Sequence, residues 1–466
     1  MTRVHAFTDD ALADHDAVGL VTELHEGRVS IPEVVEAAIA RAERVDPQLN
    51  GLALRAYDRA RAEAADPRGG YFAGVPTLVK DNVDVEGMPS QHGSDAFVCP
   101  PCKADGEFAR MYLATGLIPI GKTQLSEFGF SAVAEHPRLG AVRNPWDTDR
   151  TAGASSSGSG AFVAAGVVPF AHANDGGGSI RIPAAVNGLV GLKPSRGRLA
   201  LDKAMGQMPI KIVADGVVSR SVRDTAALLR EAERVYRNHS LPPIGDITRP
   251  ARRRLRVAVF PESPYAASDP AVIEETMKTA ALLEELGHHV EERELPLTDT
   301  FNDDFLLYWG FLAFYLLGTG RLTFGSSWDR TKVDNLSAGL AAHCRANLRH
   351  YPGAVRRLRR LGTMSAELYR EVDVVLSPTL ATATPRVGHL DPMQDYETVR
   401  DRLLDWVAFT PYQNATGEPA VSLPLGTDPD GLPLGMMFSS GTGREATLLE
   451  LAYELEQARP WRRIQD

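Results

Sequence analysis

Two segments rich in glycine and serine carry the residues best suited to covalent chemistry. Residues 153–160 read Gly-Ala-Ser-Ser-Ser-Gly-Ser-Gly, and residues 174–183 read Asn-Asp-Gly-Gly-Gly-Ser-Ile-Arg-Ile-Pro. Glycine lets a backbone turn sharply and approach another group closely. Convergent backbone N–H groups are what an oxyanion hole requires. We expect one in the second segment, with Ser179 as a candidate nucleophile inside it, built from the amides of Gly176, Gly177, Gly178 and Ser179.

A serine nucleophile needs a base, and two arrangements are open. His172 and Asp175 lie near Ser179 in the sequence, but His172 falls on a predicted strand with alternating side chains, and the segment lacks the GxSxG nucleophile elbow. The other arrangement uses a neutral lysine. Lys80 ends an apolar strand, where burial lowers a lysine pKa from its usual value of about 10.4. A lysine at a strand end is more often structural, so spacing alone does not decide.

Two other motifs match known binding patterns, but their physical context argues against binding. Residues 116–123 match the phosphate-loop pattern GxxxxGKT, but the four middle residues form an apolar strand, and Pro119 has no N–H to donate to phosphate. Cys99 and Cys102 have the spacing of half a zinc site, yet no second ligand pair exists in the sequence. We therefore expect no metal and no cofactor.

Short apolar runs alternate with helical patterns over residues 72–225. The runs 76–79, 117–120 and 167–173 read as strands, and the stretches 107–115 and 158–165 read as helices. This alternation predicts an α/β fold. The nucleophile segment follows the third strand, and catalytic groups in open α/β sheets favour strand ends.

The remaining chain extends this unit. Residues 8–66 read as a helical arm, with Ser30 as an N-cap. Residues 255–293 read as strand, helix and strand, and the strand pattern returns at 372–376 and 420–425. Residues 295–370 are more helical and more variable, and we place them near the substrate pocket. We expect one domain over 1–466, with residues 72–225 as its catalytic core.

Composition narrows the class of protein. The 466 residues carry a formal net charge of −10, which argues against nucleic acid as a partner. Three cysteines and the lack of a signal-like start predict a reducing, cytoplasmic location. The apolar run 305–318 would reach about 21 Å as a helix, short of a bilayer core of about 30 Å. We expect no membrane partner, and a homodimer stays open.

Taken together, these motifs resemble the amidase signature family of serine hydrolases. The similarity covers residues 153–161 and 175–183, the lysine strand 74–82, and further blocks at 121–128, 143–146, 191–194, 222–224 and 414–420. It runs from about residue 30 to 462, in the family's order. Ile182 and Arg196 look like those of free-standing amidases, including the branch with 6-aminohexanoate cyclic dimer hydrolase.

The resemblance implies a large twisted mixed β-sheet covered by helices on both faces, and a Ser-cisSer-Lys triad. Ser179 corresponds to the nucleophile, Ser155 to the bridging serine after a cis peptide bond, and Lys80 to the base, with Asp175 and Arg181 in support. The implied reaction is hydrolysis of a small-molecule carboxylic amide through an acyl-enzyme.

Some positions depart from the family pattern, and two alternatives stay open. Ala154 and Ser157 replace common glycines, and Asn174 stands where threonine is frequent. The first alternative is the A-type glutaminase subunit of an aminoacyl-tRNA amidotransferase. The second is a non-catalytic binding protein on the same scaffold, against which the intact Lys80, Ser155 and Ser179 argue.

Overall fold

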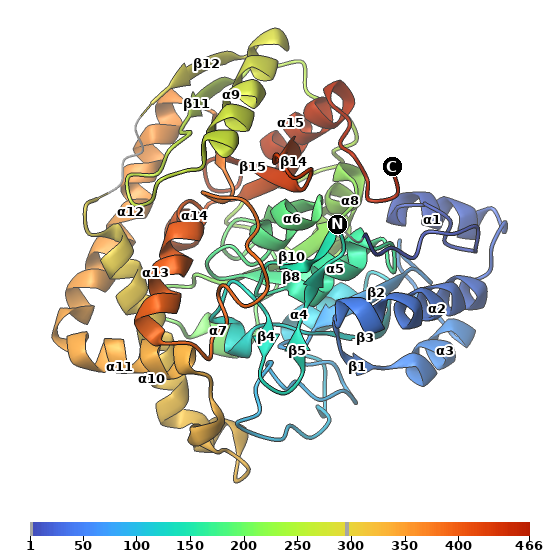
Figure 1. Ribbon diagram of the computed structural model, residues 1–466. Coiled ribbons are helices and arrows are strands. Elements are labelled where there is room, and N and C mark those ends of the chain that lie inside the picture. The colour runs from blue at the N-terminus through green and yellow to red at the C-terminus, as the bar shows by residue number, and fades with distance from the viewer. Residues whose placement is uncertain (1–2, 294–297) are drawn as a thin grey trace.

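An eight-stranded mixed sheet forms the centre of the computed structural model, which describes residues 3–293 and 298–466 (Figure 1). Strands β12, β11 and β13 run parallel, and the others pair antiparallel. The predicted α/β class is confirmed. In spatial order the strands are β12 (His289–Glu292), β11 (Arg256–Val259), β13 (Val374–Pro378), β15 (Pro433–Ser439), β14 (Ala420–Thr427), β9 (Val190–Lys193), β10 (Ala214–Ser219) and β8 (Phe170–Asp175).

Helices cover both faces of this sheet, because its central strands are buried along almost their whole length and need apolar cover on each side. On β15, Met436 meets Thr276 of α9 (Pro270–Glu285), whereas the next residue, Met437, meets Arg181 of α6 (Arg181–Asn187). Side chains of successive residues point to opposite faces. Three more helices pack against the sheet: α8 (Val222–Val235), α12 (Tyr351–Glu371) and α15 (Glu445–Ala458).

A three-stranded sheet lies beside β8 and carries Lys80 on its edge strand. Its order is β1 (Leu52–Arg55), β3 (Ile118–Thr123) and β2 (Pro76–Lys80), with α4 (Glu107–Leu113) between β2 and β3 in the chain. The Thr77 hydroxyl of β2 donates to the Phe170 carbonyl of β8 at 3.1 Å. Residues 118–123 form a buried strand and not a phosphate-binding loop, as the sequence predicts.

The N-terminal segment is partly different from the predicted helical arm over 8–66. It contains α1 (Ala17–His25), α2 (Ile31–Leu49) and α3 (Tyr57–Ala65), but the strand β1 lies between α2 and α3. Ser30 caps α2 as predicted, in a capping box with Glu33. β1 pairs antiparallel with β3. This pairing, and not the weak local pattern of its four residues, makes the segment a strand.

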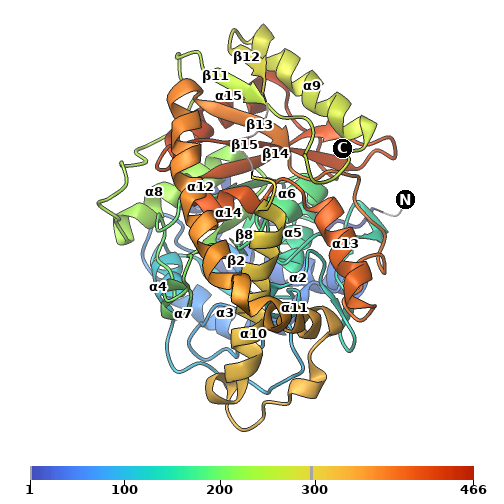
Figure 2. The same cartoon turned by 90° about the vertical axis from the view of Figure 1, so that its left-hand side faces the viewer.

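A helical layer stands in front of the sheet in Figure 2, built from α10 (Phe301–Phe324), α11 (Asn335–Asn347), α12 and the shorter α13 (Tyr396–Trp406) and α14 (Pro411–Thr416). α10 extends well beyond the apolar run 305–318. Within the described residues it is the one helix long and apolar enough to cross a membrane, and 39% of its apolar window is buried inside the protein. That test is also passed by core helices of water-soluble proteins.

Smaller elements connect these layers. They are β4 (Glu135–His136), β5 (Gly140–Ala141), β6 (Arg143–Asn144), β7 (Asp147–Thr151), α5 (Ser157–Ala164) and α7 (Lys203–Gly206). The chain ends meet, because the Arg3 guanidinium donates to the carbonyl of Asp466 at 2.8 Å.

α6 approaches the sheet so closely that glycine is required beneath it. A Cβ at Gly435 would lie 2.4 Å from the Cβ of Ala185, and one at Gly191 would lie 2.5 Å from the Cβ of Ala184. Backbone and short side chains at these contacts have no free rotation with which to move away. The two glycines therefore set the depth of α6, which follows the nucleophile segment directly.

We expect Gly435→Ala to displace α6 and destabilise the protein by about 1–3 kcal/mol through overpacking. Gly318→Ala, on an exposed turn of α10 with nothing within 4 Å, is the control and is expected to be neutral or slightly stabilising. Chemical denaturation midpoints measure both. An unchanged midpoint for Gly435→Ala would contradict the tight packing of α6.

Candidate active site

Lys80 lies at the end of β2 with its side chain fully buried. Its Nζ atom is 2.6 Å from Ser155 Oγ and 2.6 Å from Asn174 Oδ1. Burial lowers the pKa of Lys80 to about 7, although the charges of Asp215 and Asp175 act in the opposite direction. A substantial fraction of the lysine is therefore neutral at physiological pH.

Ser155 and Ser179 come from the two glycine- and serine-rich segments. Ser155 follows a cis peptide bond from Ala154 and lies just before α5. Ser179 lies between β8 and α6 and is 7% exposed. The Ser156 hydroxyl donates to the carbonyl of Ser179 at 2.6 Å, which holds the two segments together. The structure thus brings Lys80, Ser155 and the Ser179 segment to one place.

Asp175 organises the turn that carries Ser179. Its carboxylate accepts two hydrogen bonds from the Arg181 guanidinium at 2.9 Å each, and one each from the amides of Gly178 and Ile180. The Asn414 side chain also donates to it at 2.9 Å. Burial alone would raise the pKa of Asp175, but Arg181, together with Lys193 and Asn414, outweighs burial and holds this pKa at about 2. The pair is fully buried and fixes the start of α6.

The amide of Gly178 is therefore occupied, which corrects the prediction that all four amides of the turn are free for an oxyanion. It donates to Asp175 Oδ1 at 2.7 Å. Among the hydrogen bonds of the described residues, none uses the amides of Gly176, Gly177 or Ser179. Gly178 is needed for another reason: its φ is +138°, and a Cβ there would lie 2.4 Å from the Thr410 hydroxyl.

His172 does not serve Ser179. Its Nδ1 accepts a hydrogen bond from the backbone amide of Lys80 at 3.2 Å, and its Nε2 lies 3.1 Å from Asp215. Burial lowers the pKa of His172, against the influence of Asp215. The imidazole is therefore neutral and ties β2 to β8 and β10. The Ser-His-Asp alternative has no support in this geometry.

Aromatic side chains of α10 lie against the nucleophile turn. A Cβ at Gly176 would meet the Trp309 indole at 3.4 Å, and one at Gly177 would meet Phe305 at 3.9 Å. Phe305 and Trp309 stack with 6.0 Å between ring centroids, and Phe130 meets Trp309 edge-on. The helical region predicted over residues 295–370 thus supplies an apolar wall beside the turn that carries Ser179. Residues 295–297 of that region lie outside the part of the chain that the structure describes.

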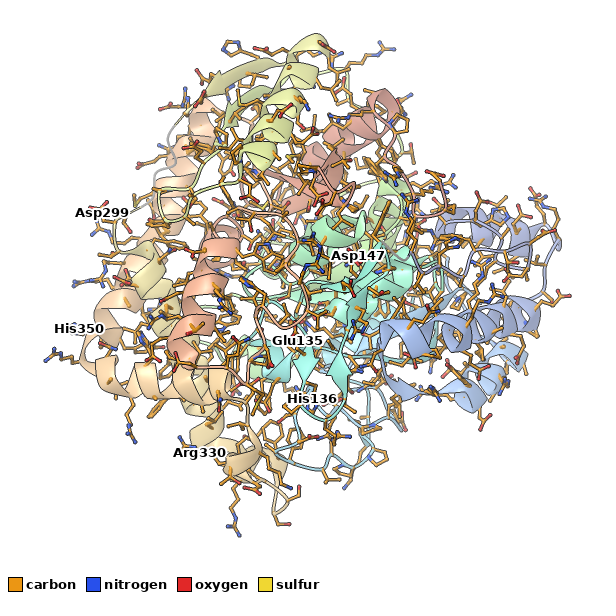
Figure 3. All side chains as sticks on the ribbon, viewed as in Figure 1. Glu135, His136, Asp147, Asp299, Arg330 and His350 are labelled. Carbon is orange, nitrogen blue, oxygen red and sulfur yellow. The ribbon has the colours of Figure 1, made fainter. Side chains whose placement is uncertain are left out.

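A cavity among the described residues lies outside the group formed by Lys80 and the two serines. It has a volume of about 610 Å³, and its lining includes Glu127, Glu135, His136 and Asp334 but none of Lys80, Ser155 and Ser179. Figure 3 labels Glu135 and His136 together on β4. Gly129, two residues after Glu127, would place a Cβ 3.3 Å from Ser155 Oγ. One short loop therefore separates this cavity from Ser155.

The cysteines are free thiols, and Cys99 and Cys102 are half-buried. Cys102 Sγ lies 3.3 Å from Asp84 Oδ1. Across residues 3–293 and 298–466, no group of three or more His, Cys, Asp or Glu side chains is placed to hold a metal ion.

We expect Asp175→Asn to lower the free energy of unfolding at pH 7 by about 3–5 kcal/mol, because Arg181 then stays buried without its counter-charge. The stabilisation by Asp175 is present above its unfolded pKa of about 3.9 and is lost as pH falls towards its folded pKa of about 2. The difference between variant and wild type, measured by denaturation, should shrink over that window. A difference independent of pH from 5 to 2 would be inconsistent with the charged pair.

Comparisons with known proteins show the family of this chain. Residues 33–449 match the family model for Amidase. A Mycobacterium leprae protein described as "Putative amidase AmiC" is 60% identical over 466 residues, covering 100% of this chain and 99% of the relative. The solved structure of 6-aminohexanoate cyclic dimer hydrolase is 31% identical with a TM-score of 0.89 (98% and 99% covered), and a bacterial aryl acylamidase is 26% identical with 0.84 (96% of both covered). The chain is therefore an amide-hydrolysing enzyme and belongs to the amidase signature family.

Proposed function

We propose that this amidase cleaves its substrate through an acyl-enzyme on Ser179, with Ser155 and Lys80 as a proton relay. The observation that carries the proposal is the 2.6 Å contact between Ser155 Oγ and the fully buried Nζ of Lys80. A buried lysine without a charged partner in contact is costly unless it is neutral. A neutral amine beside a serine hydroxyl is a general base.

The relay conserves protons through both halves of the reaction. Ser155 gives its proton to Lys80 Nζ and takes the proton of Ser179, whose Oγ attacks the amide carbonyl carbon. The C–N bond then breaks as the relay returns the proton to the leaving nitrogen. Water attacks the resulting ester as its proton enters the relay, and the relay then gives a proton to Ser179 Oγ as the C–O bond to Ser179 breaks. The products are a carboxylate and ammonia or an amine.

The oxyanion of each tetrahedral intermediate needs donors that are not already occupied. We assign this role to the amides of Gly176, Gly177 and Ser179, since the Gly178 amide donates to Asp175. Asp175 and Arg181 support the site indirectly, by holding the turn that carries these amides. The proposed hole is thus one donor smaller than expected from the sequence.

An apolar acyl group fits the wall formed by Phe130, Phe305 and Trp309. The similarity to an aryl acylamidase supports the same class of small-molecule amide. The Arg196 guanidinium donates to the carbonyls of Lys211, Asn414 and Ala415, and the glutaminase alternative stays a prediction to be tested. A panel of aryl and aliphatic amides, with glutamine included, ranks these substrates by amine or ammonia release.

We also propose a single domain over residues 1–466. A continuous apolar core joins Val4 near the start to Leu455 in α15. α10 contributes buried residues to smaller apolar clusters with other helices and loops of the chain, which favours a wall helix over a membrane anchor. A cytoplasmic location, the lack of a nucleic-acid partner and the choice between monomer and homodimer stay predictions, which fractionation and light scattering test.

Ser179→Ala and Lys80→Ala are each expected to lower amide hydrolysis by at least about 10³-fold, because the nucleophile or its base is removed. A fluorophosphonate probe should label wild type and not Ser179→Ala, which also separates an enzyme from a binding protein on the same scaffold. Wild-type turnover in either variant would contradict the proposed roles.

The acidic limb of kcat/KM against pH should report Lys80. The lysine is active when neutral, so activity is expected to fall about tenfold per pH unit below pH 7. Lys193→Met is the matched control: burial also lowers the pKa of Lys193 to about 7, but its Nζ donates to the carbonyl of Pro194, not to a serine. The limb should stay near pH 7 in this control. A wild-type limb near 10 would exclude the neutral-lysine base.

A further inference from the structure

Asn174 occupies a position that the proposed mechanism has not used. It lies on β8, one residue before Asp175, and its side chain is 6% exposed. Its Oδ1 atom is 2.6 Å from Lys80 Nζ, as close as Ser155 Oγ is. The carbonyl of the same residue lies 3.5 Å from Nζ. The lysine head group therefore touches Ser155 on one side and Asn174 on the other.

The number of hydrogens on the neutral Lys80 amine determines which group donates in its contacts with Asn174 and Ser155. A neutral amine has two N–H groups and one lone pair, whereas both oxygens of Asn174 only accept hydrogen bonds. When the N–H groups of Nζ face Asn174, its lone pair faces the Ser155 hydroxyl, which must then donate its proton. Without the Asn174 side chain, the amine is free to turn an N–H towards Ser155 Oγ, and in that orientation it is not a base.

Asn82 fixes which atom of the Asn174 amide faces the lysine. Asn174 Nδ2 donates to Asn82 Oδ1 at 3.1 Å, and Asn82 Nδ2 donates back to Asn174 Oδ1 at 3.4 Å. A flipped Asn174 amide would break both bonds and set its own N–H groups against those of Lys80. The pair of asparagines thus keeps the oxygen towards the lysine.

From this geometry we infer that Asn174 is a positioning residue for Lys80: its side-chain oxygen aims the lysine lone pair at Ser155, and Asn82 locks that oxygen in place. This inference rests on the proposed relay and adds a chain-specific part to it, since Asn174 stands where threonine is frequent in the family. Asn174 does not touch the acyl or amine group of the substrate in this account, so its effect belongs to kcat and not to KM.

Other titratable groups near Lys80 must be considered before a pH profile is assigned. They are Asp175 and His172 on β8 and Asp215 on β10. An ion pair also lies nearby, between Asp81, directly after β2, and Lys122 on β3. All of them are the same in wild type and in variants of residue 174. A difference between those profiles therefore reports residue 174 acting on Lys80.

The test compares two variants with nearly the same shape as asparagine. Asn174→Asp places a carboxylate against Lys80, which favours the ammonium form, so the acidic limb should move above pH 7 and activity should recover at higher pH. Asn174→Leu removes the acceptor, so kcat should fall about 10²-fold with no upward shift. KM should change little in both. Asn347→Asp, at the end of α11, controls for the added charge and should behave as wild type.

The inference would be overturned if the acidic limb of the pH profile stays near pH 7 in Asn174→Asp and kcat stays at the wild-type value in Asn174→Leu. If Ser179→Ala is inactive in the same experiments, only the role of Asn174 fails and the relay stands. Should either variant of Asn174 not fold, Asn82→Ala is the deciding variant. Asn82 is half-buried, and its removal frees the Asn174 amide to rotate. A several-fold lower kcat with unchanged KM supports the inference, and wild-type values contradict it.

Discussion

Burial of one lysine is the constraint on which the rest of this site depends. An ammonium group in a dry interior is unfavourable, so the protein must either pair it or keep it neutral. Lys80 contacts a serine hydroxyl and an asparagine oxygen, and no carboxylate of residues 3–293 or 298–466 forms an ion pair with it. Asp175, the nearest carboxylate along β8, is instead committed to Arg181. This division of charges leaves Lys80 as a base and Asp175 as an anchor.

The fold explains how segments far apart in the chain reach the same point. β2 brings Lys80 beside β8, β8 brings Asn174 and Asp175, and the close packing of α6 on the sheet sets the height of the Ser179 turn. α10 then covers the turn with aromatic rings. Each part is held by contacts that do not involve substrate, so the site is organised before an amide binds, as electrostatic stabilisation of an oxyanion requires.

Much of this could be predicted from local sequence. The strand ending at Lys80, the glycine turn before Ser179 and the capped helix after Ser30 are all encoded by neighbouring residues. The strand β1 was missed because β3, some seventy residues later, creates it. The partners of His172 and Lys80, namely Asp215, Asn174 and Ser155, come from three different segments, and no spacing rule connects them. The occupied amide of Gly178 was missed for a related reason, since it depends on how the Asp175 carboxylate folds back.

The central claim is that Lys80 is largely neutral near physiological pH. The sequence holds eight lysines, so ¹³C-lysine labelling gives an NMR spectrum simple enough to titrate, and Lys80→Met assigns the signal. The two other buried lysines, Lys122 and Lys193, are identified separately, each with its own variant. The account predicts a titration midpoint near 7 for the Cε signal of Lys80. A midpoint near the ordinary lysine value of about 10.4 would contradict it.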